Sequence, residues 1–208
     1  MPKPNTGADR EVRATRPAEI RTAEDGTIRV SGYAAVFGEE ADIAGMFREV
    51  IAPGAFRQAI GRDDVVFVIN HDGLPLARTR SGTLTLREDA RGLFMETELD
   101  PEDPDVRSIV PKMKRGDLDK MSFAFRARKQ EWDDTQDPPL RTVLEVDLFD
   151  VSIVTNPAYD GTEIGLRSLA AAREARGDPA AAARARLRMK QGLRDRGAHR
   201  NQVADSRT

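Results

Sequence analysis

Lys-Met-Ser-Phe-Ala-Phe, residues 120–125, alternates bulky apolar residues with short or polar ones. This period-two pattern is typical of a strand with one buried face. The methionine and the two phenylalanines would point into a core, whereas Ser122 and Ala124 would point the other way. A small hydroxyl residue between large apolar ones leaves space in front of its oxygen, and a substrate carbonyl must approach a nucleophile to within about 3–3.5 Å. The stretch makes Ser122 a candidate nucleophile, although a strand serine that only faces solvent would follow the same pattern.

The composition indicates one well-buried domain with tails. The chain has 208 residues, of which 39% are hydrophobic and 33% charged, and this size supports a single core. No run reaches the roughly 18 apolar residues of a membrane span, and the first residues lack the apolar segment of a signal peptide. Cysteine is absent, which excludes disulfides, thiolate zinc sites and a cysteine nucleophile, and fits a reducing compartment such as the bacterial cytoplasm.

Charge is distributed unevenly along the chain. Residues 167–208 contain ten arginines and one lysine against four acidic residues, a net charge of +7, so residues 1–166 carry −9 and the whole chain −2. Residues 1–20 are rich in Pro, Arg, Glu and Thr without periodicity, which is typical of a flexible arm. We therefore expect a flexible arm at 1–20, a folded domain at 21–166, and a basic, Ala/Arg-rich, helix-prone tail at 167–208.

The domain is expected to be mainly β, of the α+β kind, with two or three helices. Periodicity and turn residues predict strands at 27–37, within 43–51, and at 65–69, 81–86, 93–99, 120–125 and 142–155. They predict helices at 53–60 and 104–115, and Pro111 should kink or restart the second helix. Residues 131–139 are acidic and end in Pro-Pro, so we expect a loop there, with Trp132 folding back.

Only one histidine can serve as a base in the domain. The chain has two histidines, and His199 lies in the basic tail. His71 follows the unbroken apolar run Val-Val-Phe-Val-Ile at 65–69, where a strand buried on both faces would leave the core. A general base must be held by rigid structure and still reach solvent, and this position offers both. The alternative is a histidine that merely ends a strand.

A third group must orient the imidazole and stabilise its charged form. The last strand offers Glu145, Asp147 and Asp150. In strict alternation Asp150 interrupts a largely apolar face that includes Leu148, and an ionised carboxylate there needs a partner such as a histidine N–H. Asp147 shares the other face with Glu145 and is more easily solvated. We favour Asp150 as the orienting acid, with Asp147 in reserve; edge-strand charges that discourage aggregation are the alternative.

Missing motifs argue against several other kinds of site. No Gly-x-Ser-x-Gly elbow, Walker loop or dinucleotide-binding glycine fingerprint occurs. Two histidines far apart in the chain argue against a multi-histidine metal site, and no cofactor is expected. The basic tail lacks the interleaved aromatic residues of a nucleic-acid-binding surface, so nucleic acid is not an expected partner.

Several short motifs, taken together and in this order, resemble the prohead maturation protease family of tailed bacteriophages. The resemblance covers roughly residues 28–165 and rests on Gly-Tyr-Ala-Ala-Val-Phe at 32–37, Pro-Gly-Ala-Phe at 53–56, Asn-His-Asp at 70–72, Lys-Arg-Gly-Asp at 114–117, Met-Ser-Phe-Ala-Phe at 121–125 and Asp-Val-Ser-Ile-Val-Thr-Asn-Pro-Ala at 150–158. It implies a fold similar to that of the herpesvirus capsid-maturation proteases, a closed β-barrel of about seven strands surrounded by a few helices.

The resemblance also implies a serine endopeptidase with His71 as general base and Ser122 as nucleophile. The family usually has an acidic residue at the place of Asp150, whereas the herpesvirus enzymes use a second histidine, for which this domain has no candidate. Aspartate at position 150, in place of the commoner glutamate, shortens the side chain by one methylene, so Asp147 remains an alternative for the orienting acid. A loop near the Asn-Pro turn at 156–157 is the expected source of backbone N–H groups for an oxyanion hole.

By the same resemblance, the enzyme would be packaged inside the procapsid in the host bacterial cytoplasm. It would process the scaffolding part of the major capsid protein, or a separate scaffold, and then cut itself. The basic tail would dock on scaffold or capsid protein, or be a solvated segment, and the dimeric herpesvirus enzymes suggest a homodimer. The competing hypotheses are a catalytically inactive capsid-assembly protein that keeps the fold, and an unrelated β-rich binding module in which His71 and Ser122 never meet.

Overall fold

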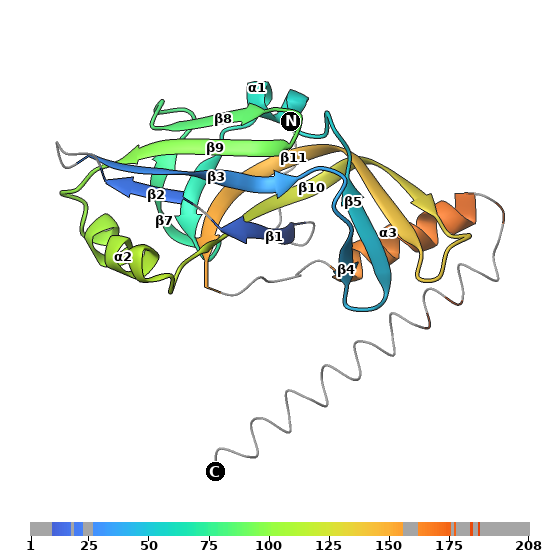
Figure 1. Ribbon diagram of the computed structural model, residues 1–208. Coiled ribbons are helices and arrows are strands. Elements are labelled where there is room, and N and C mark those ends of the chain that lie inside the picture. The colour runs from blue at the N-terminus through green and yellow to red at the C-terminus, as the bar shows by residue number, and fades with distance from the viewer. Residues whose placement is uncertain are drawn as a thin grey trace, which may run out of the picture. The chain divides into compact units, whose positions relative to one another are not determined.

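A computed structural model describes residues 10–17, 19–22, 27–155 and 162–175 and the single positions 177, 184 and 187. These residues contain eleven strands and three helices. The chain divides into two units, residues 1–160 and 161–208. All eleven strands belong to the first unit (Figure 1).

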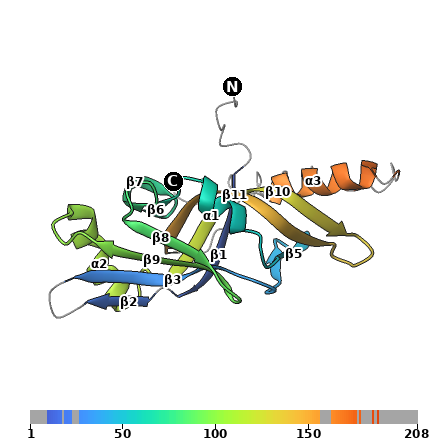
Figure 2. The same ribbon diagram turned by 90° about the horizontal axis from the view of Figure 1, so that it is seen from above.

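The strands form two sheets (Figures 1 and 2). The larger sheet has seven strands. Five of them lie side by side in the order β1 (Glu11–Pro17), β10 (Lys120–Asp133), β11 (Leu140–Val154), β5 (Phe47–Ile51) and β4 (Ala41–Ile43). The other two form a branch, in which β6 (Val66–Ile69) pairs with β11 and β7 (Asp72–Arg78) pairs with β6. The smaller sheet has four strands, in the order β2 (Glu19–Thr22), β3 (Ile28–Val36), β9 (Gly92–Leu99) and β8 (Leu84–Glu88). Strand β3 contacts β1 and β10, so the smaller sheet packs against the larger one.

This arrangement corrects the expectation of a closed barrel of about seven strands. Among the described strands, β1 and β4 of the larger sheet and β2 and β8 of the smaller one lie at the ends of their sheets and do not pair with each other, so both sheets are open. A barrel closes only when its first and last strands pair. Here β11, which has 15 residues, pairs with β10 on one side and is shared by β5 and β6 on the other. The sheet therefore branches at β11 instead of curling back to β1.

The expected flexible arm at residues 1–20 is also corrected where the chain is described. Strand β1 pairs with β10, with Ala14 opposite Ser122, and β2 pairs with β3. Glu11 and Arg13 of β1 are buried, because they meet opposite charges on β11 and β5. Ion-paired residues thus occupy buried positions of β1, and for this reason no apolar period marks the segment as a strand.

The second unit contains α3 (Thr162–Ala175), which crosses the boundary expected between domain and tail at residues 166 and 167. The rest of the basic tail, including His199, lies outside the described residues apart from positions 177, 184 and 187.

Helix α2 (Pro104–Arg115) has the bounds that its pattern predicts. The Asp103 carboxylate caps its N-terminus by accepting a hydrogen bond from the N–H of Asp105 at 2.8 Å. Gly116 ends the helix with a φ of 81°, a left-handed conformation that glycine adopts without strain. The helix continues through Pro111 instead of restarting there, and its apolar stripe packs into the core on both sides of the proline.

Other predicted elements occur with changed ends. The helix expected at 53–60 is α1 (Arg57–Arg62), which begins after a turn at residues 53–56. Strand β10 continues into the loop expected at 131–139, as far as Asp133, so Trp132 is a buried strand residue that packs edge-on against Phe47, with ring centroids 5.1 Å apart.

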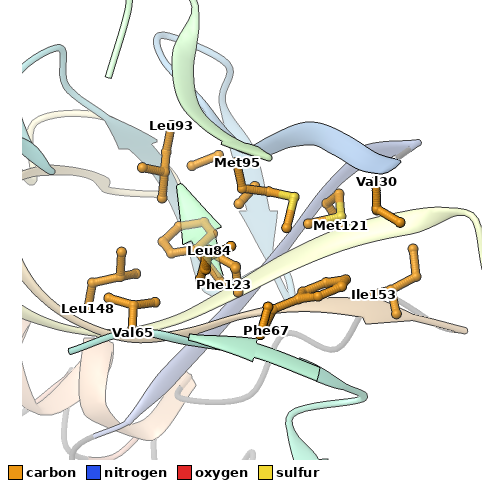
Figure 3. Packing of buried hydrophobic residues seen from close by; sticks show 14 of the residues in the cluster. Val30, Val65, Phe67, Leu84, Leu93, Met95, Met121, Phe123, Leu148 and Ile153 are labelled. Atoms are coloured by element: carbon orange, nitrogen blue, oxygen red, sulfur yellow. The ribbon is translucent and has the colours of Figure 1, made fainter. Parts of the chain in front are cut away.

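Apolar side chains of both sheets and α2 form one core (Figure 3). In this view Val30 and Met95 of the smaller sheet face Phe67 and Phe123 of the larger sheet. The three large apolar residues of the 120–125 stretch belong to the core, as their spacing predicts. The fold is therefore organised around the β10 strand, whose other face carries Ser122.

Leu148, which is 2% exposed, and Leu74, which is 77% exposed, provide a matched test of this core. Leu148→Ala should lower the free energy of unfolding by about 2–5 kcal/mol, because it removes buried methyl groups and leaves a cavity. Leu74→Ala should change it by no more than about 0.5 kcal/mol. Urea denaturation followed by circular dichroism measures both, and equal effects of the two substitutions would contradict this account of the core.

Candidate active site

Three neighbouring strands of the larger sheet bring small and polar residues to one face; Figures 1 and 2 show two of them, β10 and β11, side by side. Ser122 of β10 lies opposite Ser152 of β11, and Ala124 lies opposite Asp150. Strand β6 runs parallel to β11 on its other side, with Val68 next to Ser152. Residues paired across neighbouring strands point to the same face. Both serines and the aspartate therefore share the face that points away from the hydrophobic core.

A β-bulge in β11 determines which residues reach this face. Ala124 pairs with Asp150 and Phe125 with Leu148, so Phe149 is an extra residue in β11. One extra residue reverses the alternation of side chains. After the bulge the odd-numbered residues Val151 and Ile153 belong to the core. Just before the bulge the even-numbered residues Val146 and Leu148 do. The strict alternation expected for this strand, with Leu148 and Asp150 on one face, is therefore wrong.

His71 lies in the two-residue turn that joins β6 to β7. Ile69 pairs with Asp72 across the turn, and Asn70 and His71 have φ angles of 50° and 61°. Positive φ at both central positions is the geometry of a type I′ hairpin turn, which suits asparagine but strains a histidine. The His71 N–H donates to Ser152 Oγ (3.2 Å), and the Asn70 N–H donates to a carbonyl of β11 (3.0 Å). Strand β11 thereby holds the strained turn in place.

The imidazole connects a serine to a carboxylate. His71 Nε2 lies 2.7 Å from Ser122 Oγ, and His71 Nδ1 lies 2.6 Å from Asp150 Oδ1. Because an ionised carboxylate only accepts hydrogen bonds, Nδ1 carries the proton and Nε2 is left to accept from the Ser122 hydroxyl. The hydroxyl of Ser152 donates to Asp150 Oδ1 at 2.8 Å, so it orients the carboxylate as well as the turn. The structure thus brings together the three residues singled out in the sequence and adds Ser152, which follows Asp150 by two positions on the same face.

Two residues at the N-terminal end of the described chain also reach this site. The guanidinium of Arg10 forms an ion pair with Asp150 and lies 3.5 Å from the carbonyl oxygen of His71. The backbone carbonyl of Arg13, in β1, accepts a hydrogen bond from Ser122 Oγ at 2.7 Å. The single hydroxyl hydrogen of Ser122 therefore has two acceptors at the same distance. No sequence signal marked Arg10 or Arg13, because neither belongs to an apolar period.

Asp147, the reserve candidate, has other partners. It is Asp150 that contacts the imidazole, whereas the Asp147 carboxylate accepts hydrogen bonds from Arg62, Arg126 and Arg128. Burial raises the pKa of the Asp147 carboxyl, but the hydrogen bonds from Arg126 and Arg128 outweigh burial and hold this pKa below its usual range. Asp147 thus serves as the anionic centre of an arginine cluster.

Some kinds of site are not formed by the described part of the chain. Its histidine, aspartate and glutamate side chains make no cluster of three or more that could hold a metal ion. None of its helices is both long and apolar enough to cross a bilayer. The Asn-Pro turn expected to supply oxyanion-hole donors lies outside the described residues.

Comparison with known proteins identifies the family. Residues 16–175 match the family of caudovirus prohead serine proteases, and the chain belongs to this family. It is similar to the prohead protease of Enterobacteria phage HK97, with 30% identity over 148 residues. That alignment covers 68% of this chain and 61% of the HK97 protein, so the chain spans less than two thirds of its relative's length. Among solved structures, it is similar to the bacteriophage T4 capsid assembly protease gp21, with a TM-score of 0.48 and 11% identity over 70% of this chain and 98% of that one.

The lowered pKa of Asp147 predicts a loss of stability in acid. A carboxyl with a lower pKa in the folded state stabilises the fold above its unfolded pKa, about 3.9, and loses this contribution as the pH falls through the folded value. Asp147→Asn should lower the free energy of unfolding by about 1–2 kcal/mol at pH 7, because three arginines lose a charged partner. The difference from wild type should shrink progressively below about pH 4.

Urea denaturation between pH 2 and pH 7 measures this difference. Asp72→Asn, at an exposed position, controls for the removal of one negative charge. A difference between wild type and Asp147→Asn that stays constant down to pH 2 would contradict the assigned role of the arginine cluster.

Proposed function

We propose that the chain is a serine endopeptidase in which Ser122 is the nucleophile, His71 the general base and Asp150 the orienting acid. The observation that carries this proposal is the continuous set of hydrogen-bond contacts, 2.7 Å from Ser122 Oγ to His71 Nε2 and 2.6 Å from His71 Nδ1 to Asp150 Oδ1. The same arrangement of roles recurs on unrelated folds and is recognised by geometry. Membership in the prohead serine protease family supports it.

The mechanism follows from the direction of these hydrogen bonds. His71 Nε2 takes the proton of Ser122 as its oxygen attacks the carbonyl carbon of a peptide bond, and Asp150 stabilises the imidazolium that results. The imidazolium then gives its proton to the leaving nitrogen, the C–N bond breaks, and an acyl-enzyme remains. Water, activated by the same imidazole, attacks this ester, which releases the second fragment and restores Ser122.

Capsid and scaffold proteins are the proposed substrates, and the procapsid inside the host bacterial cytoplasm is the proposed place of action. Family membership supports this role, as does the HK97 prohead protease, to which the chain is similar. Cutting of the enzyme itself is part of the proposal. The basic tail at residues 167–208 is proposed to dock on capsid or scaffold protein, because its +7 net charge contrasts with the acidic remainder of the chain.

One observation favours a second candidate, a catalytically inactive assembly protein with the protease fold. Ser122 is 0% exposed, and β1 lies along its strand. In this state a peptide cannot reach the hydroxyl. The two candidates differ in whether the protein ever cuts a peptide bond, so the substitution of the nucleophile distinguishes them.

Ser122→Ala should abolish cutting of co-expressed major capsid protein and of the chain itself, because loss of the nucleophile costs at least about 10⁴-fold in rate. Ser81→Ala, at an exposed serine in a turn, should process both proteins as the wild type does. Gel electrophoresis and mass spectrometry of the fragments measure the outcome. Identical band patterns for wild type and Ser122→Ala, with neither protein processed, would reject the protease.

Asp150→Asn and Asp147→Asn compare the two candidate acids. Asp150→Asn should lower the cleavage rate by about 10⁴-fold, because the amide no longer selects the imidazole tautomer that accepts from Ser122. Asp147→Asn should retain cleavage, since its carboxylate binds arginines instead of the imidazole. The reverse result in single-turnover cleavage assays would transfer the role to Asp147.

A further inference from the structure

Strand β1 lies along the edge of β10, the strand that carries Ser122. We propose that this edge is the surface on which an extended substrate segment binds as an added antiparallel strand, and that β1 is the chain's own segment occupying it in a resting state. This inference rests on the proposed protease function. It assigns the substrate-binding surface, the conformation of the bound substrate and the event that opens the site.

The pairing of β10 leaves one place beside Ser122 for such a strand. Its other edge is covered by β11 along almost its whole length, so a peptide can pair with β10 beside Ser122 only where β1 now pairs. Extended peptides commonly bind by adding a strand to an exposed sheet edge, where main-chain hydrogen bonds provide affinity. With β1 in place, Ser122 has no exposed surface. Substrate binding therefore requires β1 to leave.

A main-chain carbonyl oxygen of β1 contacts the nucleophile as a hydrogen-bond acceptor. Ala14 lies directly opposite Ser122, and the preceding carbonyl, that of Arg13, lies 2.7 Å from Ser122 Oγ. A hydroxyl that donates its hydrogen to this carbonyl does not donate it to His71 Nε2. Strand β1 thereby occupies the reacting hydroxyl with a carbonyl oxygen, which is not a carbon open to attack, and it diverts the hydrogen that the base must remove.

Arg10 adds a second contact from the same segment. Its guanidinium pairs with the Asp150 carboxylate and lies 3.5 Å from the carbonyl oxygen of His71. A positive charge there offsets part of the negative charge that would stabilise an imidazolium. When β1 leaves, Arg10 leaves with it, and Asp150 then serves His71 alone. The nucleophile and the acid are thus restrained by one N-terminal segment.

The buried charges that hold β1 allow it to separate. Arg13 of β1 contacts Glu49 (2.6 Å) and Glu11 (3.0 Å), and Arg141 contacts Glu11 (2.9 Å) and Glu49 (2.8 Å). When β1 departs, it carries away the pair of Glu11 and Arg13 and leaves the pair of Glu49 and Arg141. Removal of one partner alone would leave an uncompensated buried charge, which is far more costly than a buried ion pair that stays intact. Within this cluster of four charges neither half is left with a net charge, as expected for a strand that exchanges.

The same residues indicate the chemistry of the substrate. A segment that replaces β1 would place an acidic side chain near Arg141, a basic one near Glu49 two positions later, and a small residue such as alanine opposite Ser122. The family match begins at residue 16, so Glu11, Arg13 and Ala14 of β1 all precede it. We infer that substrates are extended segments with an acidic and a basic residue spaced two apart, followed by a small residue.

A reversible disulfide tests whether β1 must leave. Val12 and Ala124 lie directly opposite each other, within the Cα separation of roughly 4.4–6.8 Å that a disulfide requires. The chain has no cysteine of its own, so this bond is the only disulfide that the double variant Val12→Cys/Ala124→Cys can form within one chain. The readout is the rate at which a fluorophosphonate probe labels Ser122, together with cleavage of the major capsid protein, before and after reduction with dithiothreitol.

The oxidised form should be labelled at least about tenfold more slowly than the reduced form, and reduction should restore labelling and cleavage. The single variant Val12→Cys and the wild type, treated in the same way, should not respond. Equal labelling of the oxidised and reduced forms, with the disulfide confirmed by mass spectrometry, would overturn the role of β1. Absence of labelling and cleavage in every form would instead reject the protease itself.

The double variant Glu11→Gln/Arg13→Gln tests the same inference from the opposite direction. It weakens the attachment of β1, keeps the net charge, and leaves Glu49 paired with Arg141. Labelling of Ser122 and cleavage of capsid protein should become faster than in the wild type, although the protein becomes less stable to urea. A purely structural role of these charges predicts unchanged or slower reaction, and that result would overturn the inference.

Discussion

The contact between His71 and Ser122 depends on one register, that of β10 against β11. The two residues are 51 positions apart in the chain, and they meet because Ser122 lies opposite Ser152, whose hydroxyl accepts from the His71 backbone. A shift of one residue in this pairing would turn every side chain of the strand to the other face. The core side chains of β10, including Phe123, resist that shift. The residues that stabilise the fold are therefore the ones that align the site.

The strand around Ser122 could be predicted because its alternation is strict and its two faces differ strongly in size. The next strand could not be predicted in the same detail, since the bulge at Phe149 has no compositional mark and reverses the faces on either side of it. Asp150 is the acid that contacts the imidazole, although the face on which the sequence placed it was wrong. The sheets are open because two parallel strands, β5 and β6, share one edge of β11. No local sequence pattern encodes this sharing.

The strand in the N-terminal segment cannot be predicted from local sequence, for a related physical reason. Sequence patterns treat glutamate and arginine as surface residues, because an isolated ion is costly to bury. In this protein Glu11 and Arg13 lie in the interior with Glu49 and Arg141, and the four charges sum to zero. Partners on β5 and β11, far away in the chain, make burial possible. A pattern read along β1 alone contains no information about them.

The turn that carries His71 sets a limit on how this fold can vary in length. The imidazole is attached to the backbone of a two-residue hairpin connection, and one inserted residue would displace it by up to roughly 3.3 Å. That displacement exceeds the tolerance of a hydrogen bond. The connection between β10 and β11, in contrast, lies at the far end of both strands from Ser122. Loops grafted for engineering or acquired by insertion belong at that distant connection, while the short hairpin has to keep its residue count.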